Sequence, residues 1–230
     1  MLFLAGHVVN ELNSLNKVFM WCLHGQSEER PSKLNSVAQG VQAMVYARIL
    51  AGKISEAWES LKPAWFRNKL ASRLEPALHP DAVASLSALK LYFGKSSPIN
   101  RVRNSFAFHY SARALSAHWQ EAVGEEQYEA ISGGIIGNNL HLGAEMVANV
   151  AVFRSVGSAG PAESLQVFFD DVQTMANHMT TFLEGVTMRI TEIALGTSLE
   201  VAAKEESIAV TQSFGEVSIP YFCAPDAKDA

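Results

Sequence analysis

The chain has little cysteine: only Cys22 and Cys223 occur among its 230 residues. The two do not form a Cys-x-x-Cys pair and show no spacing typical of a metal site. Small secreted proteins that rely on disulfides carry many more cysteines, and free thiols persist in reducing compartments. The scarcity therefore excludes a disulfide scaffold and indicates a reducing environment.

Long hydrophobic runs are also missing. No apolar stretch approaches the roughly 18–20 residues that a transmembrane helix needs. Residues 1–6 are apolar, but no basic residue precedes them and polar residues follow at once. This pattern does not fit a signal peptide. We therefore expect a cytoplasmic protein that has no membrane partner.

The motifs of several enzyme classes are absent: there is no Gly-rich phosphate loop, no nucleophile elbow and no Cys–His arrangement. Two groups at helical spacing have the residue types of a metal site, His118 with Glu121 and Glu125, and His141 with Glu145. Each stands without the second pair on another helix that a di-metal bundle requires. We therefore expect neither a metal nor another cofactor.

The composition is that of a globular protein, with 48% hydrophobic and 18% charged residues. Nearly every apolar pattern repeats with the helical period. The expected helices cover residues 2–23, 33–50, 54–62, 79–93, 125–132, 140–153 and 161–195, with a further one starting at Ser97-Pro98. We expect Gly52 to end the second helix. The sequence thus predicts a single all-α domain, a helical bundle over residues 1–196.

A C-terminal arm over residues 197–230 has a different character. Residues 207–222 are rich in strand-forming side chains, interrupted by Gly215 and Pro220. The segment is too short to build a sheet of its own. We expect an extended arm that lies on the helical body or on a partner.

Charge is distributed unevenly along the chain. Residues 1–59 are neutral in sum, residues 60–120 carry a net charge of +7, and residues 121–230 carry −12, which gives −5 in total. An acidic chain does not coat nucleic acid in bulk, but a local basic region can contact phosphates. The basic third is therefore the place to look for an RNA-binding site.

That third contains the segment Arg101-Val-Arg-Asn-Ser-Phe-Ala-Phe-His-Tyr110. In it, Asn104 follows Arg103 directly, and five residues separate Arg103 from His109. A guanidinium holds a phosphate through paired hydrogen bonds, and a histidine transfers protons near neutral pH. Together these groups suffice to cleave RNA without a metal, with the ribose 2′-hydroxyl as nucleophile.

A single straight helix would separate the two main residues. Arg103 and His109 would lie about 120° apart around its axis, so they would not readily grip one phosphate. Two solutions remain open. The helix starts late or bends between the two residues, or a two-fold axis brings Arg103 of one copy towards His109 of another.

The segment resembles the signature of the HEPN superfamily, in which four to six residues separate an arginine from a histidine and a polar residue often follows the arginine. The resemblance implies a small all-helical homodimer whose two motifs meet in a cleft. It also implies a metal-independent endoribonuclease of a bacterial abortive-infection or toxin-type system, with RNA as substrate and a cognate antitoxin protein as a further partner.

The same resemblance suggests roles for the residues. His109 would take the 2′-hydroxyl proton or protonate the leaving 5′-oxygen, Arg103 would offset the charge on the phosphorane, and Asn104 would orient the phosphate or the histidine. The candidate substrate-binding residues are Arg101, Arg113 and Tyr110.

Other interpretations stay open. The chain could be a non-catalytic RNA- or protein-binding module that dimerises through the same helices, because many HEPN-like proteins bind without cleaving. It could also be a plain helical scaffold in which Arg103 pairs with a carboxylate and His109 bonds a carbonyl. His7 and Glu11, spaced i and i+4, could line a cleft or form a surface pair.

Overall fold

The computed structural model describes residues 1–24, 32–107, 111–123, 129–157, 160–202, 204, 208–210, 212–217 and 219–224. The α-helices are α1 Leu2–His24, α2 Lys33–Leu61, α3 Lys69–Leu74, α4 Pro80–Phe93, α5 Pro98–Val102, α6 Ala112–Val123, α7 Leu142–Val156, α8 Pro161–Leu195 and α9 Leu199–Ala202. Short π- or 3₁₀-helical turns are η1 Lys62–Phe66, η2 Glu75–Ala77, η3 Arg103–Ala107, η4 Ile136–Asn138 and η5 Phe214–Glu216. The described residues contain no strand, so the prediction of an all-α helical bundle is confirmed.

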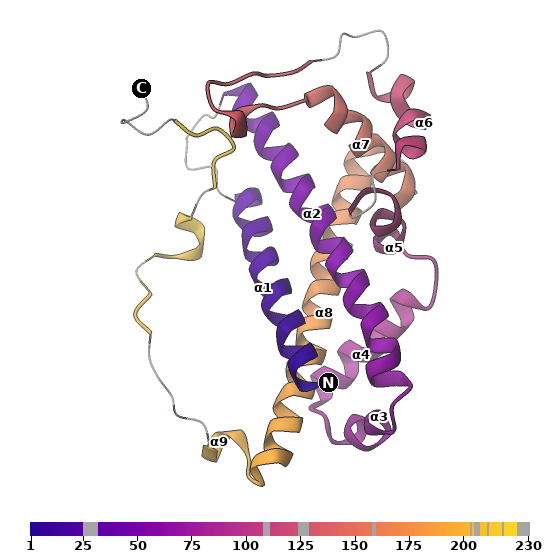
Figure 1. Cartoon of the computed structure of the whole chain (residues 1–230), viewed down its shortest axis with the longest axis vertical. Helices are drawn as coiled ribbons and strands as arrows, with labels where there is room; N and C mark the ends of the chain where they lie inside the picture. The colour runs from indigo at the N-terminus through magenta and orange to yellow at the C-terminus, as the bar shows by residue number, and fades with distance from the viewer. Residues whose placement is uncertain are drawn as a thin grey trace.

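Three long helices, α1, α2 and α8, form the centre of the bundle, and α4 packs against α8 (Figure 1). Their facing sides bury one continuous apolar core. Its largest fully buried side chains include Trp65, Phe19, Phe168, Phe182 and Leu50. Burial of such apolar surface supplies the main favourable free energy of folding, about 25 cal/mol per Å².

Helix ends follow the local signals in the sequence. Pro80 and Pro161 occupy first-turn positions of α4 and α8, where a missing N–H does no harm. Gly196 ends α8 with a φ of 68°, a left-handed conformation that glycine adopts without strain. The helices predicted over 2–23, 79–93, 140–153 and 161–195 are therefore confirmed to within a few residues.

The prediction for Gly52 was wrong. It is buried within α2, which runs unbroken through both segments that were expected as separate helices. A glycine inside a helix costs about 1 kcal/mol relative to alanine. Its neighbours Leu50, Ala51 and Ile54 are fully buried, and their burial outweighs that cost.

The helix expected over 125–132 is also not found in its described part. Residues 125–128 lie outside the described residues, and Ile131 forms an antiparallel bridge with Leu140 instead of a helical turn. The chain between them is a loop that contains Gly133 and the turn η4. Glycine and asparagine breakers in this loop favour turns over a helix.

The C-terminal arm runs from the end of α9 back along α1 to the start of α2 (Figure 1). Residues Ile219–Cys223 contact the helical body, where Tyr221 and Phe222 pack against a small apolar cluster from α2, the loop before α7 and the start of α7. Within the described part of the chain, no helix combines the length and hydropathy needed to cross a bilayer.

Candidate functional site

The motif starts at the firmly anchored helix α5. The hydroxyl of Ser97 caps it by accepting a hydrogen bond from the Asn100 N–H at 3.3 Å, and Pro98 follows in the first turn. Ile99 and Val102 are fully buried. Both side chains are therefore part of the core, which holds the residues that follow in a fixed position.

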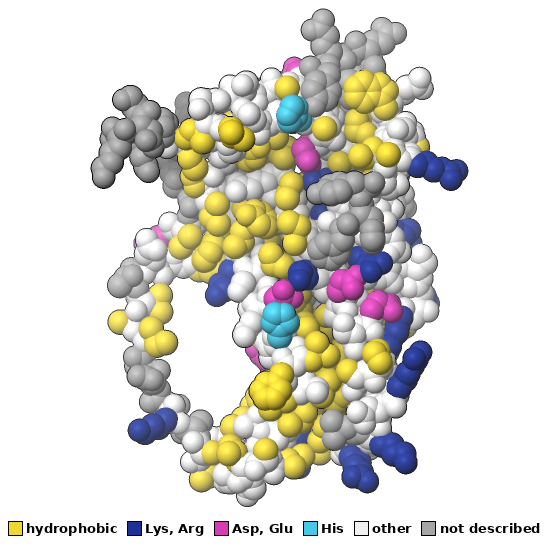
Figure 2. All heavy atoms as spheres, in the orientation of Figure 1, with side chains coloured by type: hydrophobic (Ala, Val, Ile, Leu, Met, Phe, Trp, Pro, Cys, Tyr) yellow, Lys and Arg dark blue, Asp and Glu magenta, His cyan; other side chains and the backbone are white. Residues whose placement is uncertain are grey.

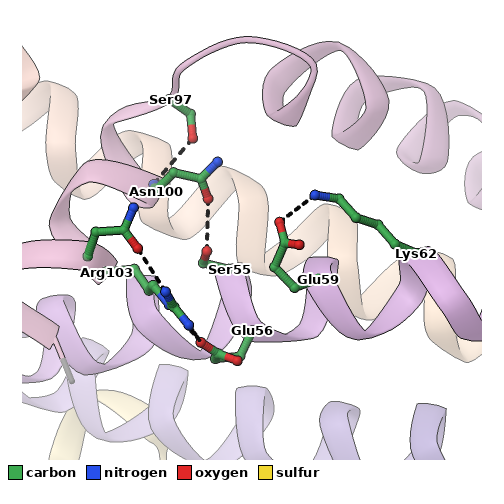
Figure 3. A network of polar contacts seen from close by, with 8 residues as sticks. Ser55, Glu56, Glu59, Lys62, Ser97, Asn100 and Arg103 are labelled. Atoms are coloured by element: carbon green, nitrogen blue, oxygen red, sulfur yellow. Dashed lines mark hydrogen bonds and ion pairs between the residues drawn. The ribbon is translucent and has the colours of Figure 1, made fainter. Parts of the chain in front are cut away.

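Two adjacent residues of α2 dock this segment (Figure 3). The buried Ser55 hydroxyl donates to Asn100 Oδ1 at 2.8 Å, and the carboxylate of Glu56 accepts from Arg103. Because the two contacts come from one turn of one helix, the orientation of α5 and the position of Arg103 are set together.

The chain does not continue as a straight α-helix through the motif. After Val102 it forms the π-helical turn η3, and α6 begins only at Ala112. The described part of the motif, Arg103–Ala107, is therefore π-helical and not α-helical. π-helical turns are often found at functional sites. His109 and Tyr110 lie outside the described residues, so their positions stay predictions.

Arg103 is held on two sides. Its Nε donates to Glu56 Oε1 at 2.6 Å, its Nη2 contacts the same oxygen, and its Nη1 donates to Asn104 Oδ1 at 2.8 Å. The side chain is 30% exposed and that of Glu56 is 43% exposed. The guanidinium is thus reachable from solvent, but one carboxylate oxygen occupies an edge with which it would bind a phosphate.

Arg101 and Arg113 have different surroundings. The Nε of Arg101 donates to the Ser155 carbonyl at 2.6 Å, and its Nη1 donates to the Ser96 carbonyl at 3.0 Å. These bonds tie α5 to the last turn of α7. Arg113 is exposed on α6. Of the two, Arg113 is the better placed to meet a substrate phosphate.

A small polar cavity of about 150 Å³ opens between α1 and α2 beside the motif. Its charged and titratable lining is His7, Glu11, Lys53 and Glu56. Lys53 Nζ donates to Glu11 Oε1 at 2.8 Å, and this hydrogen bond lowers the pKa of the Glu11 carboxyl. His7 Nε2 lies 3.9 Å from the same oxygen. Because Glu56 lines the cavity and also binds Arg103, the cavity adjoins the motif.

From the sequence, His7 and Glu11 could line a cleft or form a surface pair. Both line this cavity, and with side chains 71% and 36% exposed they also form a surface pair. Sequence reasoning missed Lys53 and Glu56, although their i, i+3 spacing puts them on one helix face. Because the sequence predicted a helix end at Gly52, this spacing was not identified as part of one long helix. Figure 2 shows acidic, basic and histidine side chains gathered near the middle of one face, between apolar areas.

A second cavity, of about 480 Å³, lies between α6 and α7. Its described lining is Leu115, Ser116, Trp119, Ala144 and Val147. This lining is apolar apart from one hydroxyl, so it offers no counter-charge for a phosphate.

The two metal-type pairs are engaged by arginines. Arg154 Nε donates to Glu121 Oε1 at 2.8 Å, and Arg48 Nη2 donates to Glu145 Oε2 at 2.7 Å. The bond from Arg154 also lowers the pKa of Glu121. His118 lies 3.7 Å from the Glu121 carboxylate. The described residues hold no group of three or more side chains suited to a metal.

Comparison of the chain with protein-family models, with curated proteins and with solved structures gave no match. The likeness to the HEPN superfamily therefore depends on the motif and on the helical fold.

Proposed function

We propose that this chain is a HEPN-like, metal-independent endoribonuclease of a bacterial defence or toxin-type system, acting in the cytoplasm as a homodimer. The observation that supports it best is the surface position of Arg103 and Asn104, side by side on a π-helical turn and next to a polar cavity. A fixed cation and amide at the surface provide a preorganised site for a phosphate.

In this mechanism an RNA phosphate takes the place of Glu56 on the guanidinium of Arg103. The ribose 2′-oxygen then attacks the adjacent phosphorus, and the bond from phosphorus to the 5′-oxygen breaks. One His109 takes the 2′-hydroxyl proton, and the His109 of the second copy protonates the 5′-oxygen. Arg103 offsets the charge of the phosphorane, and Asn104 keeps the phosphate aligned.

Point variants test the chemistry. Arg103→Ala and His109→Ala should each lower the rate of RNA cleavage at least about a hundredfold, the low end for charge stabilisation and for acid–base catalysis. Chelators should not change the wild-type rate. His118→Ala, at a partly exposed histidine of α6 that contacts Glu121, is the matched control and should keep full activity. Cleavage that requires added metal, or full activity of His109→Ala, would refute the mechanism.

Assembly has its own test. Two copies are needed to supply both proton-transfer groups, so light scattering should show a dimer at micromolar concentration. A chain that is purely monomeric there would lack the composite site. A cognate antitoxin protein would act by covering that site.

The ion pair of Arg103 with Glu56 favours a second candidate, a non-catalytic RNA- or protein-binding helical dimer. In such a protein the pair would be permanent and Arg103 would serve the fold. Glu56→Gln distinguishes the two: in an enzyme it frees Arg103 for phosphate and tightens RNA binding, whereas in the binding module it only lowers stability.

A further inference from the structure

The end of the arm packs against the start of α2 and the loop before α7, and we call this contact surface the groove. The side chains of Tyr221 and Phe222 contact an apolar cluster on the body. Its buried members are Ala38, Val41 and Leu140, with Val45, Ile131 and Leu142 partly buried around them. Two adjacent aromatic rings thus anchor the arm to apolar side chains of the body, as is common in peptide recognition.

Hydrogen bonds also connect the arm to the helical body. The Asn138 amide forms a two-point contact, in which Nδ2 donates to the Cys223 carbonyl at 2.7 Å and Oδ1 accepts from the Cys223 N–H at 2.9 Å. Gln39 Nε2 donates to the Ile219 carbonyl at 3.2 Å, and the Tyr221 hydroxyl donates to the Asn139 carbonyl at 3.0 Å. Main-chain hydrogen bonds combined with side-chain pockets are the usual basis of extended-peptide binding.

The loop that carries Asn138 is held by hydrogen bonds of its own. Ile131 and Leu140 exchange two backbone hydrogen bonds at 2.7 and 2.9 Å, and the Gly133 N–H donates to Asn139 Oδ1 at 2.9 Å. A Cβ atom at Gly133 would lie only 2.6 Å from the Cβ of Asn138, so glycine is required there. A rigid loop loses little entropy on binding, which favours affinity.

Several described residues between α9 and this segment are more exposed. Ile208 is 84% exposed and Val210 is 82% exposed, and the Phe214 ring meets that of Trp21 at 5.7 Å. The connection from residue 202 to residue 219 spans at most about 60 Å at 3.3–3.6 Å per residue. The arm is therefore a ligand on a tether, bound mainly through its last described residues.

We propose that this groove is a peptide-binding site whose ligand is the segment Ile219–Cys223, held by its own chain and open to exchange with the same segment of a second copy. A second copy is the matched partner because it carries the identical aromatic pair and backbone. The inference depends on the arm and on α2 and α7, not on the Arg103 motif. Tethering raises the local concentration of the chain's own segment to about the millimolar range. This segment therefore outcompetes that of a second copy unless a substitution weakens its binding.

Peptide binding provides the test. The probe is a fluorescent peptide with the sequence of residues 217–224, and the receptor is the full chain with Tyr221→Ala and Phe222→Ala, which empties the groove. Fluorescence anisotropy should show saturable binding to this receptor and at least about tenfold weaker binding to the wild type, because the tethered segment competes.

Further substitutions locate the site. Adding Asn138→Ala to the receptor should weaken peptide binding at least about tenfold through loss of the two-point contact, whereas adding Asn13→Ala, on the exposed side of α1, should change nothing. The Asn138→Ala single variant, with its arm released, should displace the peptide from the receptor. A chain that carries Asn138→Ala together with Tyr221→Ala and Phe222→Ala should not displace the peptide, because its arm lacks the two aromatic rings. This control distinguishes exchange of the arm from dimerisation through the Arg103 motif.

Two results would overturn the proposal: no peptide binding to a receptor with native circular dichroism, or equal binding to the wild type. If the double substitution prevents folding, Phe222→Ala alone serves as receptor under the same criteria. Failure of RNA cleavage would leave these outcomes unchanged.

Discussion

At the scale of single residues, Tyr92 and Asp171 join the end of α4 to α8. The Tyr92 hydroxyl donates to Asp171 Oδ2 at 2.7 Å. Burial raises the pKa of Tyr92, with a further contribution from Asp171. Burial also raises the pKa of Asp171, against the lowering effect of the hydrogen bond from Tyr92. Between the usual Asp pKa of 3.8 and the raised value, the folded state binds more protons, so this carboxyl favours folding less as pH rises.

Tyr92→Phe removes the donor and leaves the half-buried carboxylate without that partner. At pH 7 the free energy of unfolding should fall by about 1–3 kcal/mol, the usual cost of an unmet buried polar group. Near pH 3, below both the usual Asp pKa of 3.8 and the raised pKa of Asp171, the loss should be smaller, because the carboxyl is then mostly protonated and carries little charge for the donor to stabilise. Urea unfolding at the two pH values measures this, with Tyr46→Phe on α2 as control. An equal loss at both values would contradict the assignment.

Arg101 offers a second residue-scale prediction. Its bonds to the Ser155 and Ser96 carbonyls join α5 to α7. Arg101→Ala should lower the free energy of unfolding by about 1 kcal/mol, with little direct effect on RNA contacts. Thermal unfolding and RNA binding measured on the same sample distinguish the two effects. A stable variant with weaker RNA binding would support the substrate-binding role that the sequence predicts for Arg101.

At the scale of elements, α4 and α8 approach closely because Gly185 has no side chain. A Cβ atom there would lie 2.6 Å from the Cβ of Ala82 on α4. Both positions belong to well-packed helices, and neither backbone can retreat without opening the core. The separation of the two helices is thus set at this one residue pair.

Gly185→Ala should therefore destabilise the fold by about 1–3 kcal/mol through overpacking. Gly40→Ala is the matched control: it also lies inside a helix, and no atom is found within 4 Å of its added Cβ. That change should stabilise the chain by about 0.5–1 kcal/mol, since alanine is the better helix former. Chemical unfolding of both variants measures the change in the free energy of unfolding. A change of the same sign in both variants would refute the close approach of α4 and α8 at Gly185.

At the scale of the whole molecule, charge is separated along the chain and over the surface. The segment 60–120, with its net charge of +7, contains α3, α4 and α5 and the start of α6. Figure 2 shows Lys and Arg side chains gathered along the lower right edge of one face, over α3 and α4. A basic surface next to the motif would steer RNA to it, and the acidic remainder would repel RNA elsewhere.

RNA affinity should accordingly fall steeply with salt, because each phosphate contact releases counterions. Arg113→Ala should weaken binding and reduce the salt slope by about one unit. Lys204→Ala, an exposed substitution in the acidic third, should change neither quantity. Filter binding over a range of salt concentrations measures both, and equal losses from the two variants would mean that binding is diffuse.

The sequence by itself determined helices α1, α4, α7 and α8, because helix formation and its end signals are local. Pro161 and Gly196 frame α8, and apolar periodicity defines α1, α4 and α7. The identity and spacing of Arg103 and His109 are likewise properties of the sequence.

Only the tertiary structure decided the rest. Gly52 continues α2 because burial by distant helices outweighs its intrinsic cost. The partner of Arg103 is Glu56, 47 residues away, and Asn138 meets Cys223 across 85 residues. No local pattern encodes such contacts, because they depend on how separate elements pack against one another.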